Sequence, residues 1–411
     1  MAELTEPVAA WLCSADGRAT VTAATTDLDA GAEELALASR LRAGGLRPDR
    51  ATAVLGAATA RRRARDRWPD ADDLLFVPTG LEQASDPDVA TWRARRLVAA
   101  DATAGRPVWD LCAGLGADAM ALAAAGADVT AVDLDPGRLR LLEHNAERRG
   151  LRIRTLEADA LAVRPPPDAL LHADPSRRTG GRRARRLAEH HPPVGELLAV
   201  HADAPGTGVV LSPAVDLDDP DLPEDAELEF VSVDGDLKES VVWLGEPRRY
   251  GVVASATLLP GGHHRSRGAA RPSLEVRDLG THLVEVAPAA VRARLHDQVG
   301  LEIGAGRVAR RRALLTVDAR PPVSPWYRVR PVLEILPARA KVVRRWLRQY
   351  PGVAVEIVVH GLAADPGQWW RELGRPPRGP QGLRVELIRT DDGARVAVTD
   401  VRPAPSATLP S

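Results

Sequence analysis

Short apolar runs alternate with longer amphipathic segments between residues 104 and 260. The short runs have the length and the β-branched content of buried strands, while the longer segments repeat their apolar positions at helical spacing. This alternation predicts an α/β fold with a doubly wound, Rossmann-like sheet. The predicted strands are 107–111, 128–133, 152–157, 168–173, 208–212, 226–234, 239–245 and 252–258, and the predicted helices are 117–126, 136–149 and 194–202.

The pattern changes on both sides of this alternation, which indicates more than one domain. Residues 1–100 are rich in alanine and arginine at helical spacing and predict a helical N-terminal region. The α/β pattern is predicted to form one domain over 101–262, and the aperiodic Gly, Pro and polar residues that follow predict a linker over 263–274. Further apolar runs predict a C-terminal domain of strands and helices over 275–403, and 404–411 is expected to be a disordered tail.

The composition is that of a water-soluble globular protein, with 45% hydrophobic and 27% charged residues. No apolar run approaches the roughly 20 residues of a membrane span, so no membrane partner is expected. The only two cysteines, Cys13 and Cys112, are far apart and lack metal-ligand spacing, so neither a disulfide nor a metal site is expected. Few cysteines and the absence of a secretory signal predict a cytoplasmic protein.

A glycine-rich turn follows the predicted strand 107–111 and leads into a predicted helix. Gly114 and Gly116 leave the backbone bare, so a ligand can approach the amides of the turn and of the helix. Asp133 ends the next strand, where a carboxylate can accept hydrogen bonds from both hydroxyl groups of a ribose. These features predict a site for a nucleoside cofactor. Residues 114–119 also fit the G-x-G-x-x-A pattern, which leaves a nicotinamide dinucleotide enzyme as an alternative.

Three further acids lie at the ends of predicted strands. Asp110 precedes the glycine turn, Asp159 closes the third strand, and Asp174 follows the fourth. Because ligands of open α/β sheets bind at the carboxyl ends of strands, these acids and Asp133 are expected to converge on one crevice. Asp110 would lie near the amino-acid end of S-adenosyl-L-methionine and Asp159 near its adenine, so the set favours this cofactor over a dinucleotide.

Residues 70–260 resemble a class I S-adenosylmethionine-dependent methyltransferase, and the whole chain resembles a bacterial family that joins this domain to a C-terminal THUMP-like domain. The segments that carry the resemblance are LEQAS (81–85), DLCAGLGAD (110–118), AVDLD (131–135), DPSRRTGGRR (174–183), EFVSVDGDLKESVVW (229–243), PW (325–326), VLEILPARAK (332–341) and DP (365–366). The resemblance implies a Rossmann-like methyltransferase sheet, a helical N-terminal extension and an α+β THUMP-like domain. The cofactor-binding residues that it implies are Asp110, Cys112, Gly114, Gly116, Asp133 and Asp159.

The chain departs from this family pattern at two places. Cys112 stands where the turn usually has its first glycine, which narrows the floor of the site. Val358, Val359 and His360 stand where the THUMP-like part usually has basic residues before its glycine, here Gly361, which argues against RNA binding at that strand.

Asp174 and Pro175 have the position of the Asn/Asp-Pro-Pro-aromatic signature of amino-group methyltransferases. In those enzymes the acid or amide side chain and the proline carbonyl hold the substrate amino group, so these two are the candidate catalytic residues. The aromatic residue is replaced here by Ser176 and Arg177, so an arginine plane or a residue from elsewhere has to stack on a substrate base. The candidate substrate-binding residues are Ser176, Arg177, Arg178, Arg182 and Arg183, whose guanidinium groups can pair with phosphates.

Three other groups of polar residues receive no catalytic role from the sequence. The arginine run at 61–67 is interpreted as the exposed face of a helix. His172 and the pair His190-His191 are interpreted as a strand residue and a loop pair rather than as metal ligands. Lys238 and Glu239 lie in one of the segments that carry the resemblance, but the sequence assigns them no physical role.

The leading hypothesis is an S-adenosylmethionine-dependent methyltransferase that acts on a base nitrogen of structured RNA, such as tRNA or rRNA. One alternative is a small-molecule methyltransferase, which a deep, aromatic-lined pocket would favour. Another is an inactive methyltransferase fold that binds RNA. A dehydrogenase comes last, because the sequence shows no catalytic acid–base pair.

Overall fold

The computed structural model describes residues 4–99, 105–176, 178–179, 182–183, 186–270, 272–374 and 382–400, with the backbone alone for 178–179 and 182–183. The chain divides into two compact units, one of residues 1–233 and 238–253 and the other of residues 234–237 and 254–411. The predicted tail 404–411 lies outside the described residues. None of the helices in the described part of the chain is long and apolar enough to cross a membrane.

The alanine-rich N-terminal residues form helices that pack on one another. Alanine favours the helix, and proline occupies the first turn of several of these helices, where its missing N–H costs no hydrogen bond. Ser14 caps the second helix by accepting a hydrogen bond from Gly17 N at 3.2 Å. The helices are α1 (Glu6–Cys13), α2 (Ala15–Asp29), α3 (Glu34–Ala43), α4 (Pro48–Ala64), α5 (Pro78–Gln83) and α6 (Pro87–Ala99). Their apolar side chains form a shared core.

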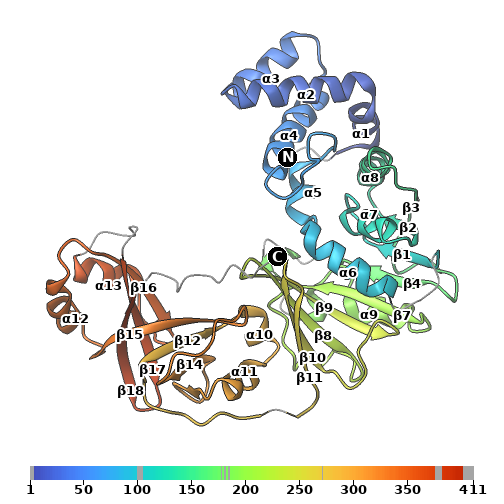
Figure 1. The fold of residues 1–411 in the computed structure, drawn as a ribbon. Helices are drawn as coiled ribbons and strands as arrows, with labels where there is room; N and C mark the ends of the chain where they lie inside the picture. The colour runs from blue at the N-terminus through green and yellow to red at the C-terminus, as the bar shows by residue number, and fades with distance from the viewer. Residues whose placement is uncertain are drawn as a thin grey trace. The chain divides into compact units, whose positions relative to one another are not determined.

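The predicted strands of the α/β region form a mixed sheet in the first unit, shown in Figure 1. Its strands are β1 (Pro107–Leu111), β2 (Asp128–Asp133), β3 (Ile153–Glu157), β4 (Leu170–Ala173), β7 (Gly206–Leu211), β8 (Glu227–Val233) and β9 (Asp236–Gly245). Their order is β8-β9-β7-β4-β1-β2-β3, with parallel pairing from β7 to β3 and with β9 antiparallel to β7. The apolar pattern is thus confirmed strand by strand here.

The order in which strands are added to the sheet reverses at β1, and this creates a crevice. After β1 the chain adds β2 and β3 on one side and then returns to place β4 on the other side. Ligands of open α/β sheets bind at such a switch point, beside the carboxyl ends of the strands. The helices of this region are α7 (Ala117–Ala124), α8 (Pro136–Arg148) and α9 (Val194–Val200). Since α7 and α8 begin soon after β1 and β2, their N-termini lie at the same crevice.

The second unit contains a hairpin and a seven-stranded sheet. The hairpin pairs β10 (Ala254–Leu259) with β11 (His263–Arg267) in antiparallel register. The sheet has the order β13-β14-β12-β15-β18-β17-β16, in which only β16 and β17 of the described pairs are parallel. Its strands are β12 (His282–Val286), β13 (Gly306–Arg307), β14 (Leu314–Val317), β15 (Tyr327–Pro337), β16 (Ala354–His360), β17 (Gly382–Thr390) and β18 (Gly393–Asp400), and its helices are α10 (Pro288–Arg292), α11 (His296–Glu302), α12 (Ala340–Trp346) and α13 (Pro366–Leu373).

The irregular linker expected over 263–274 begins with a strand instead, namely β11. Its sequence, HHRSR, has no apolar alternation. The strand is held instead by backbone hydrogen bonds to β10. The side chains of Thr257 on β10 and His264 on β11 meet through polar atoms, with Oγ1 and Nδ1 3.0 Å apart. A search for apolar positions therefore could not find this strand.

Candidate active site

A cleft of about 1170 Å³ opens at the carboxyl ends of β1, β2, β3 and β4. The predicted site residues that line it are Asp110, Cys112, Gly114, Asp133, Asp159, Asp174, Pro175 and Ser176. Gly116 is absent from the described lining. Arg177 lies outside the described residues, and Arg178, Arg182 and Arg183 are described only as backbone.

Asp133, at the end of β2, is held by two backbone amides. Its Oδ2 accepts a hydrogen bond from Gly114 N at 2.8 Å, and its Oδ1 accepts one from Asp135 N at 2.9 Å. Because a carboxylate offers about four acceptor positions, each oxygen retains capacity for another donor. The side chain is therefore fixed at the cleft in a geometry that can receive a pair of hydroxyl groups.

The two glycines of the turn have different roles. Gly114 has φ +57°, and a Cβ added there would meet no atom within 4 Å, so its bare backbone borders the open cleft. Gly116 has φ +80°, and a Cβ added there would lie 2.3 Å from Leu142 Cγ. Gly116 therefore lets the turn pack against α8, and its contact with a ligand stays a prediction.

Cys112 adopts a left-handed conformation with φ +65°, a region that favours the glycine expected at this position. Burial raises the pKa of its thiol far above the ordinary value. The charges of Asp133, Asp174, Asp110 and Asp159 raise this pKa further. All four acids are therefore near enough to the Cys112 thiol to affect its pKa, as expected if they converge on one crevice. A thiol that stays protonated is a poor nucleophile.

The end of the cleft beside β3 contains one predicted residue and one that the sequence did not single out. Asp159 Oδ1 accepts a hydrogen bond from Leu161 N at 2.9 Å, so this oxygen caps its own turn. Leu134 lies between Asp133 and Asp135, lines the cleft, and is 64% exposed. A leucine exposed in a cleft offers an apolar face to a flat ring, but a lone leucine after a strand gives no signal in the sequence.

Asp110, at the end of β1, pairs with a histidine from β4. Its Oδ1 lies 2.7 Å from Nδ1 of His172, and both side chains are almost fully buried. Burial disfavours the charged imidazole, but the carboxylates of Asp118 and Asp110 outweigh this effect and raise the pKa of His172. The other oxygen of Asp110, Oδ2, is buried and has no hydrogen-bond partner among the described residues.

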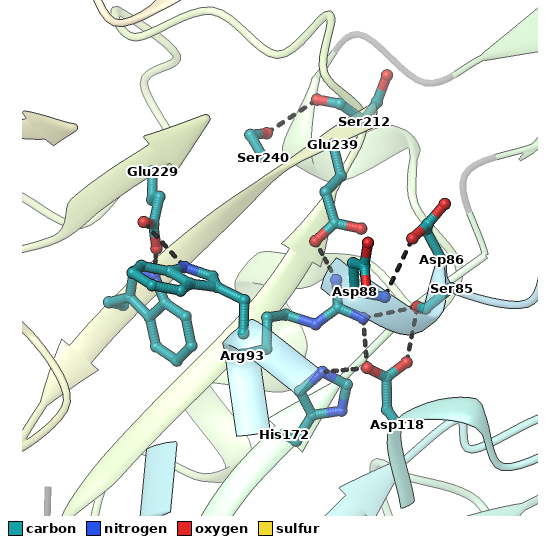
Figure 2. A network of polar contacts seen from close by, with 12 residues as sticks. Ser85, Asp86, Asp88, Arg93, Asp118, His172, Ser212, Glu229, Glu239 and Ser240 are labelled. Atoms are coloured by element: carbon teal, nitrogen blue, oxygen red, sulfur yellow. Dashed lines mark hydrogen bonds and ion pairs between the residues drawn. The ribbon is translucent and has the colours of Figure 1, made fainter. Parts of the chain in front are cut away.

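Arg93 on α6 joins these groups into a buried network (Figure 2). Its guanidinium donates to Asp118, to Glu239 and, at 2.6 Å, to Ser85 Oγ. Ser85 Oγ donates to Asp118 Oδ2 at 2.7 Å, and Asp118 Oδ1 lies 3.8 Å from His172 Nε2. Three resemblance segments that are far apart in the sequence therefore meet at one guanidinium, and Glu239 gains a physical role.

This network places three acidic side chains beside the cleft. They are Asp110, Asp118 and Glu239, which all line the cleft, and they pair with Arg93 and His172. Burial favours the neutral form of Asp118, but the charge of Arg93 outweighs burial and lowers the pKa of Asp118. Burial outweighs the charge of His172 at Asp110 and raises the pKa of this carboxyl, so a cationic ligand group would favour its ionised form.

The chain leaves β4 through Asp174, Pro175 and Ser176. Asp174 N donates to Leu111 O at 3.2 Å, which holds this segment against the end of β1. Ser176 and His191 exchange two backbone hydrogen bonds of 2.9 and 3.1 Å. The antiparallel ribbon of β5 (Arg178–Thr179) and β6 (Arg182–Arg183) lies between them in the chain. The arginine-rich segment therefore begins and ends beside Asp174.

A second group of potential ligands lies outside the cleft, in the second unit. Glu285, His360 and Glu386 are close enough to share a cation. However, Arg384 contacts Glu285 at 2.9 Å and Glu386 at 3.4 Å, and Arg330 contacts Glu285 at 3.1 Å. Guanidinium groups thus already balance these carboxylates.

Known proteins identify the chemistry of the cleft. Residues 108–173 match the family profile of a methyltransferase domain. An uncharacterized S-adenosylmethionine-dependent methyltransferase of Mycobacterium tuberculosis (strain CDC 1551 / Oshkosh) is 31% identical over 363 residues, which cover 85% of this chain and 96% of that protein. This chain belongs to the S-adenosylmethionine-dependent methyltransferases. The predicted enzyme class and its cofactor, S-adenosyl-L-methionine, are confirmed.

Two further similarities define how far this assignment extends. The methyltransferase shares its fold with a proposed methyltransferase of Porphyromonas gingivalis W83, with a TM-score of 0.69, 20% identity, and coverage of 87% of this chain and 92% of that chain. A demethylmenaquinone methyltransferase of Thermus thermophilus is 38% identical over 122 residues, or 29% of this chain and 52% of that protein. The THUMP-like character of the C-terminal unit stays a prediction.

The cleft fits the cofactor chemically. S-adenosyl-L-methionine, when bound, supplies a methyl group on a sulfonium and also carries a ribose diol and a cationic amino group. Asp133 has acceptor capacity for a diol, and the bare backbone of Gly114 allows close approach. The unpartnered Oδ2 of Asp110 is a buried acceptor that a cationic donor would satisfy.

Proposed function

We propose that this methyltransferase transfers a methyl group to a base nitrogen of structured RNA, such as tRNA or rRNA, in the cytoplasm. The observation that carries the proposal is the position of Asp174 and Pro175. The pair follows β4, lines the cleft together with the cofactor turn, and continues along the chain into the arginine-rich ribbon β5–β6. One segment thus joins acceptors for a nitrogen to cations for phosphates.

The cofactor residues are assigned by the groups that each can satisfy. Asp133 receives the ribose hydroxyls, and Asp110 receives the cationic amino-acid end. Asp159 and Leu134 receive the adenine, one through a polar contact and the other through an apolar face. The buried Oδ2 of Asp110, which has no hydrogen-bond partner among the described residues, supports the assignment of a cation to this side chain.

Methyl transfer is an in-line displacement, so the enzyme has to align the nitrogen and exclude water. The Asp174 carboxylate and the Pro175 carbonyl both accept hydrogen bonds and can hold an amino group with its lone pair directed at the methyl group. The sulfur–methyl bond breaks as the nitrogen–methyl bond forms, and the proton that the nitrogen loses passes to Asp174.

The ribbon arginines are the cations that the proposal assigns to RNA phosphates. The arginines of the run at 61–67 are exposed, as expected, except for Arg61, but several of them pair within the fold. Arg61 is buried and donates to Leu74 O at 3.0 Å, and Arg62 and Arg65 each pair with Asp29 at 2.8 Å. Binding through ribbon–phosphate contacts would weaken steeply with salt.

A small-molecule substrate is the second candidate, and the charge of the cleft lining favours it. Carboxylates such as Glu6, Glu82, Asp86 and Glu196 line the cleft in addition to the predicted acids, and they would repel phosphates. An RNA would therefore have to place only a base inside the cleft and leave its backbone outside.

Replacing Asp174 tests the proposal. With tritium-labelled S-adenosyl-L-methionine and total RNA from a strain that lacks this enzyme, the wild type is expected to label RNA. Asp174→Ala should lower the rate by about 100-fold or more, because it removes the acceptor of the amino group. Its cofactor affinity, measured by isothermal titration, should change by less than about threefold, since the assigned cofactor contacts remain.

Asp168→Ala is the matched control, because Asp168 precedes β4 at the opposite end of the strand and is exposed. It should keep both the rate and the affinity. A wild-type rate in Asp174→Ala would refute the role of that carboxylate. Label that appears only in a small-molecule extract would favour the second candidate.

A further inference from the structure

His191 reaches the cleft because the chain returns past Ser176. Two backbone hydrogen bonds fix the two residues side by side, from Ser176 N to His191 O and from His191 N to Ser176 O. The His191 side chain is exposed and lines the cleft together with Asp174, Pro175 and Ser176. The structure thus gives a position at the cleft to a residue that the sequence identified only as part of a loop.

The neighbouring histidine is fixed inside the fold. His190 is buried, with Nδ1 3.1 Å from Arg186 O and with Nε2 accepting a hydrogen bond from Ser212 N at 3.3 Å. His190 has an extended backbone, with φ −80° and ψ 161°, and adjacent side chains of an extended chain point to opposite sides. The His190 ring is thus held at the end of β7, and His191 is the histidine of the pair whose exposed side chain lines the cleft.

A base that leaves its helix loses its stacking partners and needs a flat surface in the enzyme. Among the described lining residues there is no Phe, Tyr or Trp, and His191 supplies the only aromatic ring. We propose that His191 binds the substrate by stacking on the base whose nitrogen Asp174 and Pro175 hold. This inference rests on the proposed function and adds that the substrate group is a planar, unstacked base.

The test compares His191→Phe with His191→Ala, using tRNA and rRNA fractions from a strain that lacks the enzyme as methyl acceptors. Stacking on an aromatic side chain predicts that His191→Ala lowers kcat/KM for RNA by about 10- to 100-fold, mainly through KM. His191→Phe keeps a ring without its nitrogens and should stay within about threefold of the wild type. Cofactor affinity should be unchanged in both variants, as in His263→Ala, a control from strand β11 in the second unit.

If the wild type is active, either of two results would overturn this inference without affecting the proposed function. His191→Ala with wild-type kcat/KM would show that the ring is not used. His191→Phe as impaired as His191→Ala would show that a ring nitrogen acts, through a hydrogen bond or a proton, rather than the ring face. A wild-type enzyme that binds the cofactor but labels neither RNA fraction would instead remove the proposed function, and this inference with it.

Discussion

At the scale of single residues, Asp133 illustrates what a strand-end acid can and cannot reveal in a sequence. Its position at the end of a predicted strand predicts that it binds a ribose. The two amides that hold it, from Gly114 and Asp135, belong to different turns and became visible only in the fold. Likewise, the spacing of the glycines predicted the turn but could not separate the open Gly114 from Gly116, which packs on Leu142.

Asp133→Ala should weaken binding of S-adenosyl-L-methionine by about 100-fold, because it removes two hydrogen bonds to a charged acceptor. Isothermal titration measures the affinity, and circular dichroism checks the fold. Asp128→Ala is the matched control, since Asp128 begins the same strand and pairs at its surface with Arg154 at 2.8 Å. An unchanged affinity in Asp133→Ala would place the ribose elsewhere.

At the scale of elements, apolar spacing predicted the strands that are buried and missed those held by other forces. The strands β1, β2 and β4 are largely buried and close to their predicted bounds, whereas the polar β11 depends on backbone pairing with β10. The Arg93 network could not be derived from spacing, because its members lie on β1, β4, β9, α6, α7 and the loop after α5. Only the resemblance drew attention to Ser85 and Glu239.

Arg93→Met should destabilise the protein by about 3–5 kcal/mol, because it leaves the carboxylates of Asp118 and Glu239 buried without their main cation. Urea unfolding measures the loss. Arg40→Met removes an exposed pair with Asp27 and should cost about 0–1 kcal/mol. The double variant Arg93→Met/Glu239→Gln tests whether the two side chains are coupled. If its loss in free energy of unfolding equals the sum of the losses in the two single variants, they are not coupled.

At the scale of the whole molecule, the N-terminal helices are part of the site. Leu4 before α1, Glu6 at the start of α1, Arg67 after α4 and Glu82 on α5 line the same cleft as Cys112 and Gly114. No role for residues 1–70 follows from the sequence, because their helical pattern shows only that they pack. The class of enzyme was predictable from the glycine turn together with the acids at four strand ends and the family resemblance. The substrate, in contrast, depends on side chains that different segments bring together.

The central claim, methylation of a base nitrogen in RNA, is tested most directly by identifying the product. RNA from a strain that lacks the enzyme is treated with the wild type and S-adenosyl-L-methionine, digested to nucleosides, and analysed by mass spectrometry. The account predicts one methylated nucleoside whose added methyl group is on a base nitrogen and which Asp174→Ala does not produce. A methyl group on a base carbon or a ribose, or RNA without a new modification while a small molecule is methylated, would contradict it.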